Sequence, residues 1–194
     1  SGKVPDSPVG ATPCAGGKAG VFSCNRVDLE QYLPMSSIGG GAGNDGWGWT
    51  DRDTQKEYVL MGRSTGTSFV DISSPATPIY LGDLPTHTSS SDWRDIRVYK
   101  DYAFIVSEAT NHGLQIFDLR TLRSVANPPA VFSETAHFAT FGSAHNISIN
   151  EESGFAYIVG ANVCSGGLYI VDIQDPTNPV EAGCFAEDGY THDV

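Results

Sequence analysis

The feature that most constrains the fold is a motif that recurs three times along the chain. In each copy a short apolar strand ends in Asp followed by Ile or Leu, and the aspartates lie 47 and then 54 residues apart. A pair of polar residues opens another strand 23 to 26 residues before each aspartate. Units that recur in order at this length indicate a repeat architecture. The copies are Phe69–Ile72, Ile116–Leu119 and Ile170–Ile173, and the polar pairs are Asn44-Asp45, Arg94-Asp95 and His145-Asn146.

The residues between these motifs predict an all-β chain. Apolar residues come in short runs bounded by Gly, Asn, Asp, Ser and Pro, and seldom at the spacing of a helix. The 22 Gly and 11 Pro residues are spread along the chain, which favours many tight turns. Only Val27–Tyr32 and Leu119–Val125 have the pattern of a turn or two of helix. The ten predicted strands are 58–61, 68–72, 79–81, 95–99, 102–106, 114–118, 146–149, 155–159, 168–172 and 180–185.

Four short strands in a repeat of about 40 to 55 residues are typical of a β-propeller blade. One four-stranded sheet cannot bury both of its faces, so blades stack around an axis. We predict a Gly-rich leader over residues 1–40 and blades over about 41–90, 91–140 and 141–190, with the next blade starting at 191. A β-sandwich with coincidental spacing is the alternative.

The predicted blades are too few to close a ring, because closed propellers have about four to eight. His192-Asp193 repeats the polar pair and begins the pattern of a fourth blade. We therefore expect an incomplete ring. On this interpretation the chain is a fragment, a processed product or part of a longer protein, and its remaining blades follow Val194 or come from another chain.

The four cysteines indicate an oxidising compartment. They form two close pairs, Cys14 with Cys24 and Cys164 with Cys184, and neither pair has the spacing of a zinc finger. A disulfide within each pair is the simplest interpretation, and it predicts a small disulfide loop in the leader. A turn at 175–179 would bring Cys164 within reach of Cys184. Three connectivities are possible, and four free thiols in a cytosolic protein are the alternative.

Charge and hydropathy exclude two classes of partner. The chain has 11 Lys+Arg and 23 Asp+Glu, a formal net charge of -12, and no basic run, which argues against nucleic-acid binding. No stretch approaches the roughly 20 apolar residues of a membrane span. Residues Ser1–Pro5 lack the apolar core of a signal peptide, so the chain is either cytosolic or already processed. The cysteine pairs favour a processed, extracellular protein.

The polar pairs predict a ring of polar side chains at one mouth of the central channel, where the innermost strand of each blade begins. The favoured interpretation is structural, because hydrogen bonds to the neighbouring blade would recur in every blade. The alternative is a ligand or transition-metal site, or general acid and base groups of an enzyme. Its metal ligands would be His145, His192, Asp95 and Asp193. The whole predicted ring is Asn44, Asp45, Arg94, Asp95, His145, Asn146, His192 and Asp193.

Three further segments have two interpretations each. Acidic turns at 51–57 and 150–153 are compatible with Ca²⁺, but Asp, Asn and Ser are ordinary turn formers. Gly62–Gly66 matches the GxSxG motif of hydrolases, yet predicted strands flank it on both sides, whereas the motif needs a helix to follow. The aromatic stretch Gly46–Trp49 favours packing between blades, with stacking on a sugar or a partner as the alternative.

Several segments resemble a known repeat. The strand Leu168–Ile173, the turn Asp175–Val180 and the run His192–Val194 resemble the LVIVD repeat. Over residues 24–194 the chain is similar to the choice-of-anchor B family of secreted LVIVD-repeat proteins. The segments that carry this wider resemblance are Gly43–Trp49, Trp93–Ile96, Ala144–Ile147, Cys164–Leu168 and Tyr190–Asp193.

The resemblance implies a β-propeller exported to the cell surface or the medium and anchored, in some members, by a separate C-terminal device. It implies no reaction. We therefore expect a secreted or cell-surface binding or scaffold module, with no catalytic residues assigned. Its partner would be a protein or glycan at the cell surface, or the remaining blades of the propeller. A metal-dependent enzyme or metal-binding protein, with Ca²⁺ or a transition metal at the channel mouth, is the alternative.

Overall fold

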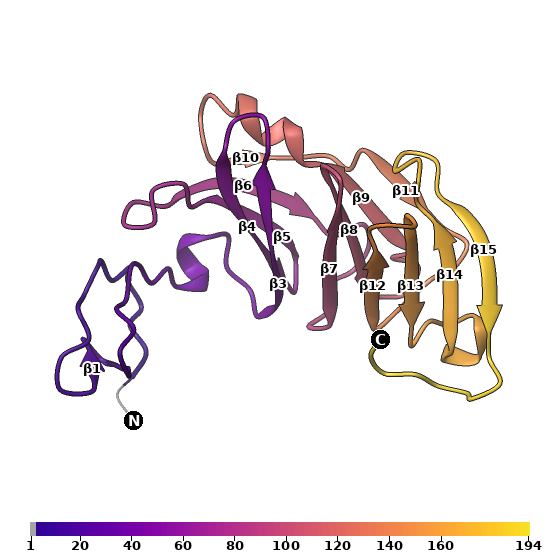
Figure 1. The fold of residues 1–194 in the computed structure, drawn as a ribbon, viewed down its shortest axis with the longest axis horizontal. Helices are drawn as coiled ribbons and strands as arrows, with labels where there is room; N and C mark the ends of the chain where they lie inside the picture. Colours follow the sequence, from indigo (N-terminus) through magenta and orange to yellow (C-terminus); the bar gives the residue numbers. More distant parts are fainter. Residues whose placement is uncertain (1–2) are drawn as a thin grey trace.

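The computed structural model describes residues 3–194, so Ser1 and Gly2 of the predicted leader lie outside it. The chain is nearly all β, and its three large sheets stand side by side in an open arc (Figure 1). Each sheet is called a blade here.

Blade 1 consists of β3 (Gly43–Asp51), β4 (Lys56–Arg63), β5 (Gly66–Asp71) and β6 (Ile79–Pro85). Blade 2 consists of β7 (Arg94–Tyr99), β8 (Tyr102–Ser107), β9 (Leu114–Asp118) and β11 (Ala136–Phe138). Blade 3 consists of β12 (Asn146–Asn150), β13 (Phe155–Val159), β14 (Leu168–Asp172) and β15 (Val180–Phe185).

All ten predicted strands are present, and the four strands of each blade pair antiparallel. The Asp-Ile motif ends the third strand of each blade, and the polar pairs open the first strands β3, β7 and β12. These first strands contact one another in succession, so they form the inner wall of the arc.

Two apolar layers hold the blades together. Between blades 1 and 2, Phe69 of β5 stacks on Phe117 of β9 with ring centroids 4.8 Å apart. Between blades 2 and 3, Phe104 and Ile116 pack against Ile158 of the next sheet. Each layer is formed by the facing sides of two neighbouring sheets, because a single sheet leaves one face uncovered.

Blade 2 contains a long connection that sequence patterning does not predict. After β9 the chain forms the 3-10 helix η2 (Leu119–Ser124), which replaces the predicted helix at 119–125. It then adds β10 (Ala130–Val131) parallel to β6, at the outer edge of blade 1, before it returns as β11. The extra strand covers a sheet edge that would otherwise present unpaired backbone groups.

The leader contains β1 (Lys18–Ala19), β2 (Phe22–Ser23) and the 3-10 helix η1 (Met35–Ser37). The predicted helix at Val27–Tyr32 is wrong. A segment of six residues gains few helical hydrogen bonds for the cost of nucleation. Instead its backbone pairs with the opposite segment through the bridges Val9–Tyr32 and Thr12–Leu29.

Both predicted disulfides are present. Cys14 is bonded to Cys24 in the leader, and Cys164 to Cys184 in blade 3. None of the helices in the described part of the chain has the length and apolar character needed to cross a membrane.

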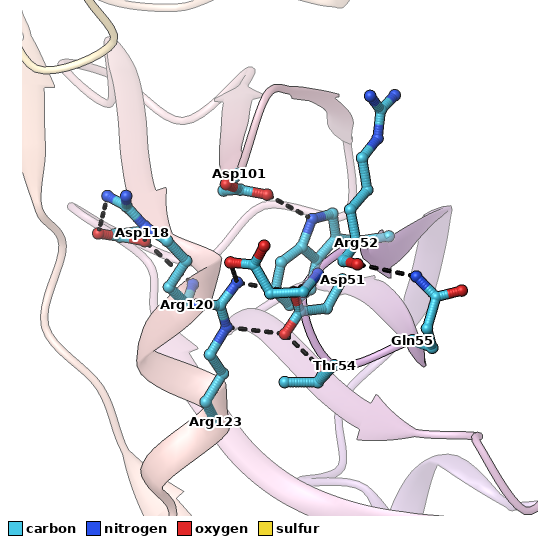
Figure 2. Close-up of polar contacts among 10 residues, drawn as sticks. Asp51, Arg52, Thr54, Gln55, Asp101, Asp118, Arg120 and Arg123 are labelled. Atoms are coloured by element: carbon cyan, nitrogen blue, oxygen red, sulfur yellow. Dashed lines mark hydrogen bonds and ion pairs between the residues drawn. The ribbon is translucent and has the colours of Figure 1, made fainter.

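An ion pair between a buried aspartate and a partly exposed arginine links blade 1 to the long connection of blade 2. Asp51, at the end of β3, is inaccessible to solvent, and Arg123 of η2 approaches both of its oxygens at 2.6 and 2.7 Å (Figure 2). Thr54 Oγ1 and the Asp53 amide donate to the same carboxylate. The Arg123 guanidinium is the main cause that lowers the pKa of Asp51 to about 2.

Candidate functional site

Most of the residues of the predicted polar ring lie close together. A hollow of about 210 Å³ lies where the inner strands begin, and six of the eight predicted residues line it together with Trp93. His192 lies beside it, with its ring centroid 4.1 Å from that of His145, and Asp193 lies 2.6 Å from His192 Nδ1. The six lining residues from the prediction are Asn44, Asp45, Arg94, Asp95, His145 and Asn146.

The aspartates of this ring join one blade to the next. The Ile96 amide of blade 2 donates to Asp45 Oδ2 at 2.9 Å. In the same way the Ile147 amide of blade 3 donates to Asp95 Oδ2 at 2.8 Å. Asn44 adds a parallel contact, since its Oδ1 accepts from the Arg94 amide at 2.8 Å. These are the contacts that an architectural role requires.

The charge of the two aspartates is balanced within the ring. Burial and the neighbouring Asp45 raise the pKa of Asp95 above its ordinary value. Arg97 Nη1 lies 2.7 Å from Asp95 and 3.5 Å from Asp45, and the guanidinium also stacks over the Trp47 ring at 4.4 Å. Arg97 is therefore the resident cation of the carboxylate pair. It is the fourth residue of β7, and only its spacing from Asp95 could have indicated this role.

We expect Asp95→Ala to destabilise the protein by about 2 kcal/mol, because the buried Ile147 amide would lose its acceptor. Urea unfolding followed by circular dichroism measures this change. Asp193→Ala is the matched control, since Asp193 opens the same motif but is exposed and bonds no neighbouring blade. Equal midpoints for the two variants would contradict the blade-joining role.

Arg94 is buried without a carboxylate partner. Its guanidinium contacts His112 Nε2 at 3.2 Å and the Thr86 hydroxyl. Burial lowers the pKa of His112 to about 4, so the imidazole is neutral near pH 7 and accepts this hydrogen bond. Burial, with the nearby Arg63, also lowers the pKa of Arg94 to about 10. The sequence contains no signal for His112 or Thr86, which lie in loops between strands.

The predicted metal ligands come together only in part. His145 Nδ1 lies 2.6 Å from Glu108 Oε1, a residue that the sequence did not single out, and the His192 ring lies alongside. The oxygens of Asp95 are instead engaged by Ile147, Ile96 and Arg97. Within residues 3–194 no group of three or more His, Cys, Asp and Glu side chains is arranged to hold a metal ion.

The acidic turns have the contacts of turn formers. The Asp51 carboxylate is bonded to Arg123, Thr54 and the Asp53 amide. In the other turn, Asn150 Oδ1 accepts from the amides of Glu152 and Ser153, both at 3.1 Å.

The two tryptophans of β3 have different surroundings. Trp49 is buried, stacks on Tyr58 with centroids 5.0 Å apart and donates to Asp101 Oδ1 at 3.3 Å, so it packs between blades. Trp47 is 40% exposed and lines a hollow of about 520 Å³. The other residues of this Trp47 hollow are Gly48, Trp49, Thr50, Arg52, Val98, Tyr99, Lys100, Asp101 and Glu151.

Comparison with known families adds one finding. Residues 141–186, which include all four strands of blade 3, match the model of the LVIVD repeat. No curated protein and no solved structure gives a significant match to the chain.

Proposed function

We propose, from the LVIVD repeat of blade 3, that this protein is a propeller module of the choice-of-anchor B type that is exported to the cell surface or medium. It acts by binding or as a scaffold. The bonded pairs Cys14–Cys24 and Cys164–Cys184 support an extracellular location, because disulfides persist in oxidising compartments. The resemblance of residues 24–194 to secreted proteins supports the same location.

The Trp47 hollow is the observation that carries the binding proposal. Arg97 covers one face of the Trp47 ring, and the adjacent Gly48 has no side chain to fill the space beside it. Asp101 and Glu151 supply acceptors, while Arg52 and Lys100 supply donors at the same site. An apolar ring face surrounded by hydrogen-bonding groups suits a glycan, whose sugar rings have apolar faces and hydroxyl edges.

We expect Trp47→Ala to weaken glycan binding at least about tenfold, since a central aromatic anchor commonly carries 2 kcal/mol or more. A defined glycan array identifies the ligand, and isothermal titration calorimetry with that glycan measures the affinity. Trp93→Ala is the matched control, because Trp93 is 54% exposed but lies outside this hollow.

Two results would contradict the proposal. One is an array on which the protein binds no glycan. The other is equal loss of affinity in the Trp47 and Trp93 variants, which would place the contact elsewhere.

A metal-binding protein or metal-dependent enzyme is the second candidate, and the approach of the His145 and His192 rings favours it. If it is correct, metal analysis of protein dialysed against Zn²⁺, Mn²⁺ or Ca²⁺ should find one bound ion per chain. A variant with His145→Ala and His192→Ala should lose that ion. Protein that retains no metal, with a double variant that is merely less stable, would favour the structural role of the ring.

A further inference from the structure

The contact that joins the blades is repeated at Asp45 and Asp95 but is incomplete at the third equivalent position. That position is Asn146, which lies at the start of β12 as Asp95 lies near the start of β7. Its Oδ1 atom is buried and has no hydrogen-bond partner. We propose that Asn146 is the latch for a further blade of the same type, and that the outward face of blade 3 is the surface on which this blade docks.

The spacing of the contacts identifies the missing donor. Asp45 accepts from the residue that follows Asp95, and Asp95 accepts from the residue that follows Asn146. By the same rule Asn146 accepts from the amide of Val194, which follows Asp193. A buried acceptor without a donor costs free energy, so this contact would stabilise the inner strand of the next blade.

The end of the chain is already close to this position. After β15 it returns to the start of β12 (Figure 1), and the Thr191 amide donates to the Gly166 carbonyl at 3.0 Å. The His192 ring lies against His145. Val194 is outside any strand and is exposed. Residues 191–194 therefore lie at the entrance of an inner strand that is not yet paired.

The face of blade 3 that points away from blade 2 has apolar side chains at the same positions as the face of blade 2 that packs against blade 3. Leu168 and Phe185 are paired across β14 and β15, as Leu114 and Phe138 are across β9 and β11. The pair in blade 2 is buried against blade 3, whereas Phe185 is exposed and Leu168 only half-buried. Tyr157 and Ile170 likewise correspond to buried Phe104 and Ile116.

These observations indicate that the partner of the outward face of blade 3 is a β-sheet. The Asn146 acceptor needs a backbone amide from an extended strand beside β12, and the apolar positions repeat those that receive blade 3 on blade 2. A blade whose inner strand begins at His192 meets both requirements. Docking of a further blade on blade 3 does not depend on which ligand the propeller binds.

The test adds one further blade after Val194. A copy of residues 148–194 is appended after Val194, so that Val194 takes the place of Ile147. We expect hydrogen exchange of the Val194 amide to be slower by about tenfold or more in this extended chain than in the unextended chain. Asn146→Ala should abolish this protection, whereas Asn146→Asp should keep it, because Asp performs this role at positions 45 and 95.

The unextended chain supplies the control. There Asn146→Ala should leave the urea midpoint unchanged, while in the extended chain it should lower the midpoint. An unprotected Val194 amide in the extended chain would overturn the proposal, and so would an equal loss of stability in both chains. Sedimentation provides a further check. A dimer of the unextended chain that Ile170→Glu dissociates would show that a second copy, and not a further blade, occupies this face.

Discussion

Asp51→Ala is expected to lower the free energy of unfolding by about 3 kcal/mol, because Asp51 is a buried carboxylate in a bidentate pair with Arg123. The variant removes the ion pair that links the β3–β4 turn to η2. Urea unfolding measures the change. Asp53→Ala is the matched control, since Asp53 also contacts Arg123, at 3.0 Å, but its side chain is 76% exposed. Exposed ion pairs contribute little, so this variant should lose less than about 0.5 kcal/mol.

The pH dependence separates the charge from the turn contacts. The folded-state pKa of Asp51 is about 2, below the ordinary value of 3.8. The stability that follows from this lowering is present above about pH 4 and is lost as the pH falls through 2. It amounts to about 2 kcal/mol. Relative to Asp51→Asn, which keeps the turn acceptor, the wild-type protein should therefore lose most of its advantage between pH 5 and pH 2. A constant difference across this range would mean that the ion pair contributes no stability.

Gly82→Ala is expected to be as damaging, with a loss of about 4 kcal/mol. A Cβ atom on Gly82 would lie 1.9 Å from the Ala130 carbonyl oxygen, and the φ of +137° is one that alanine rarely adopts. The protein can relieve the clash only by releasing β10 from β6 or by moving β6. Thermal unfolding followed by circular dichroism measures the loss.

Gly183→Ala is the control for this prediction. Gly183 pairs with Ile170 as Gly82 pairs with Phe69, so the two glycines occupy the same position in their blades. Within residues 3–194, β15 is the edge strand of its sheet, so no strand covers its outer side, and a Cβ on Gly183 would meet only Ile170 Cδ1 at 3.8 Å. Equal stability of the two variants would show that β10 does not constrain blade 1.

The strands were predictable because their signal is local. Runs such as Phe155–Val159 alternate or concentrate apolar residues over a few positions, and turn residues mark both ends. The positions of Asp45 and Asp95 could be singled out for a related reason, since these residues recur at one place in each unit. The short segment Val27–Tyr32 was misjudged because its partner, residues 9–12, is not visible in its own pattern.

The roles of several site residues could not be predicted. Glu108 meets His145, and His112 meets Arg94, only because the loop between β8 and β9, which contains both Glu108 and His112, lies beside the starts of β7 and β12. Arg97 becomes the cation of the carboxylate pair because blade 1 places Asp45 beside blade 2. None of these partners stands at a spacing that repeats along the chain.

By itself the sequence determined the repeat, the strands, the cysteine pairs and the places where polar residues recur, because backbone pairing and turn chemistry depend on short-range pattern. The tertiary structure alone decided that β10 closes the edge of blade 1 over Gly82 and that Arg123 reaches Asp51. It also decided that Asn146 is left without a donor. Each of these features depends on groups about 50 or more residues apart in the sequence, which meet only when whole sheets pack together. The packing of one sheet on another leaves no pattern in the spacing of residue types along the chain.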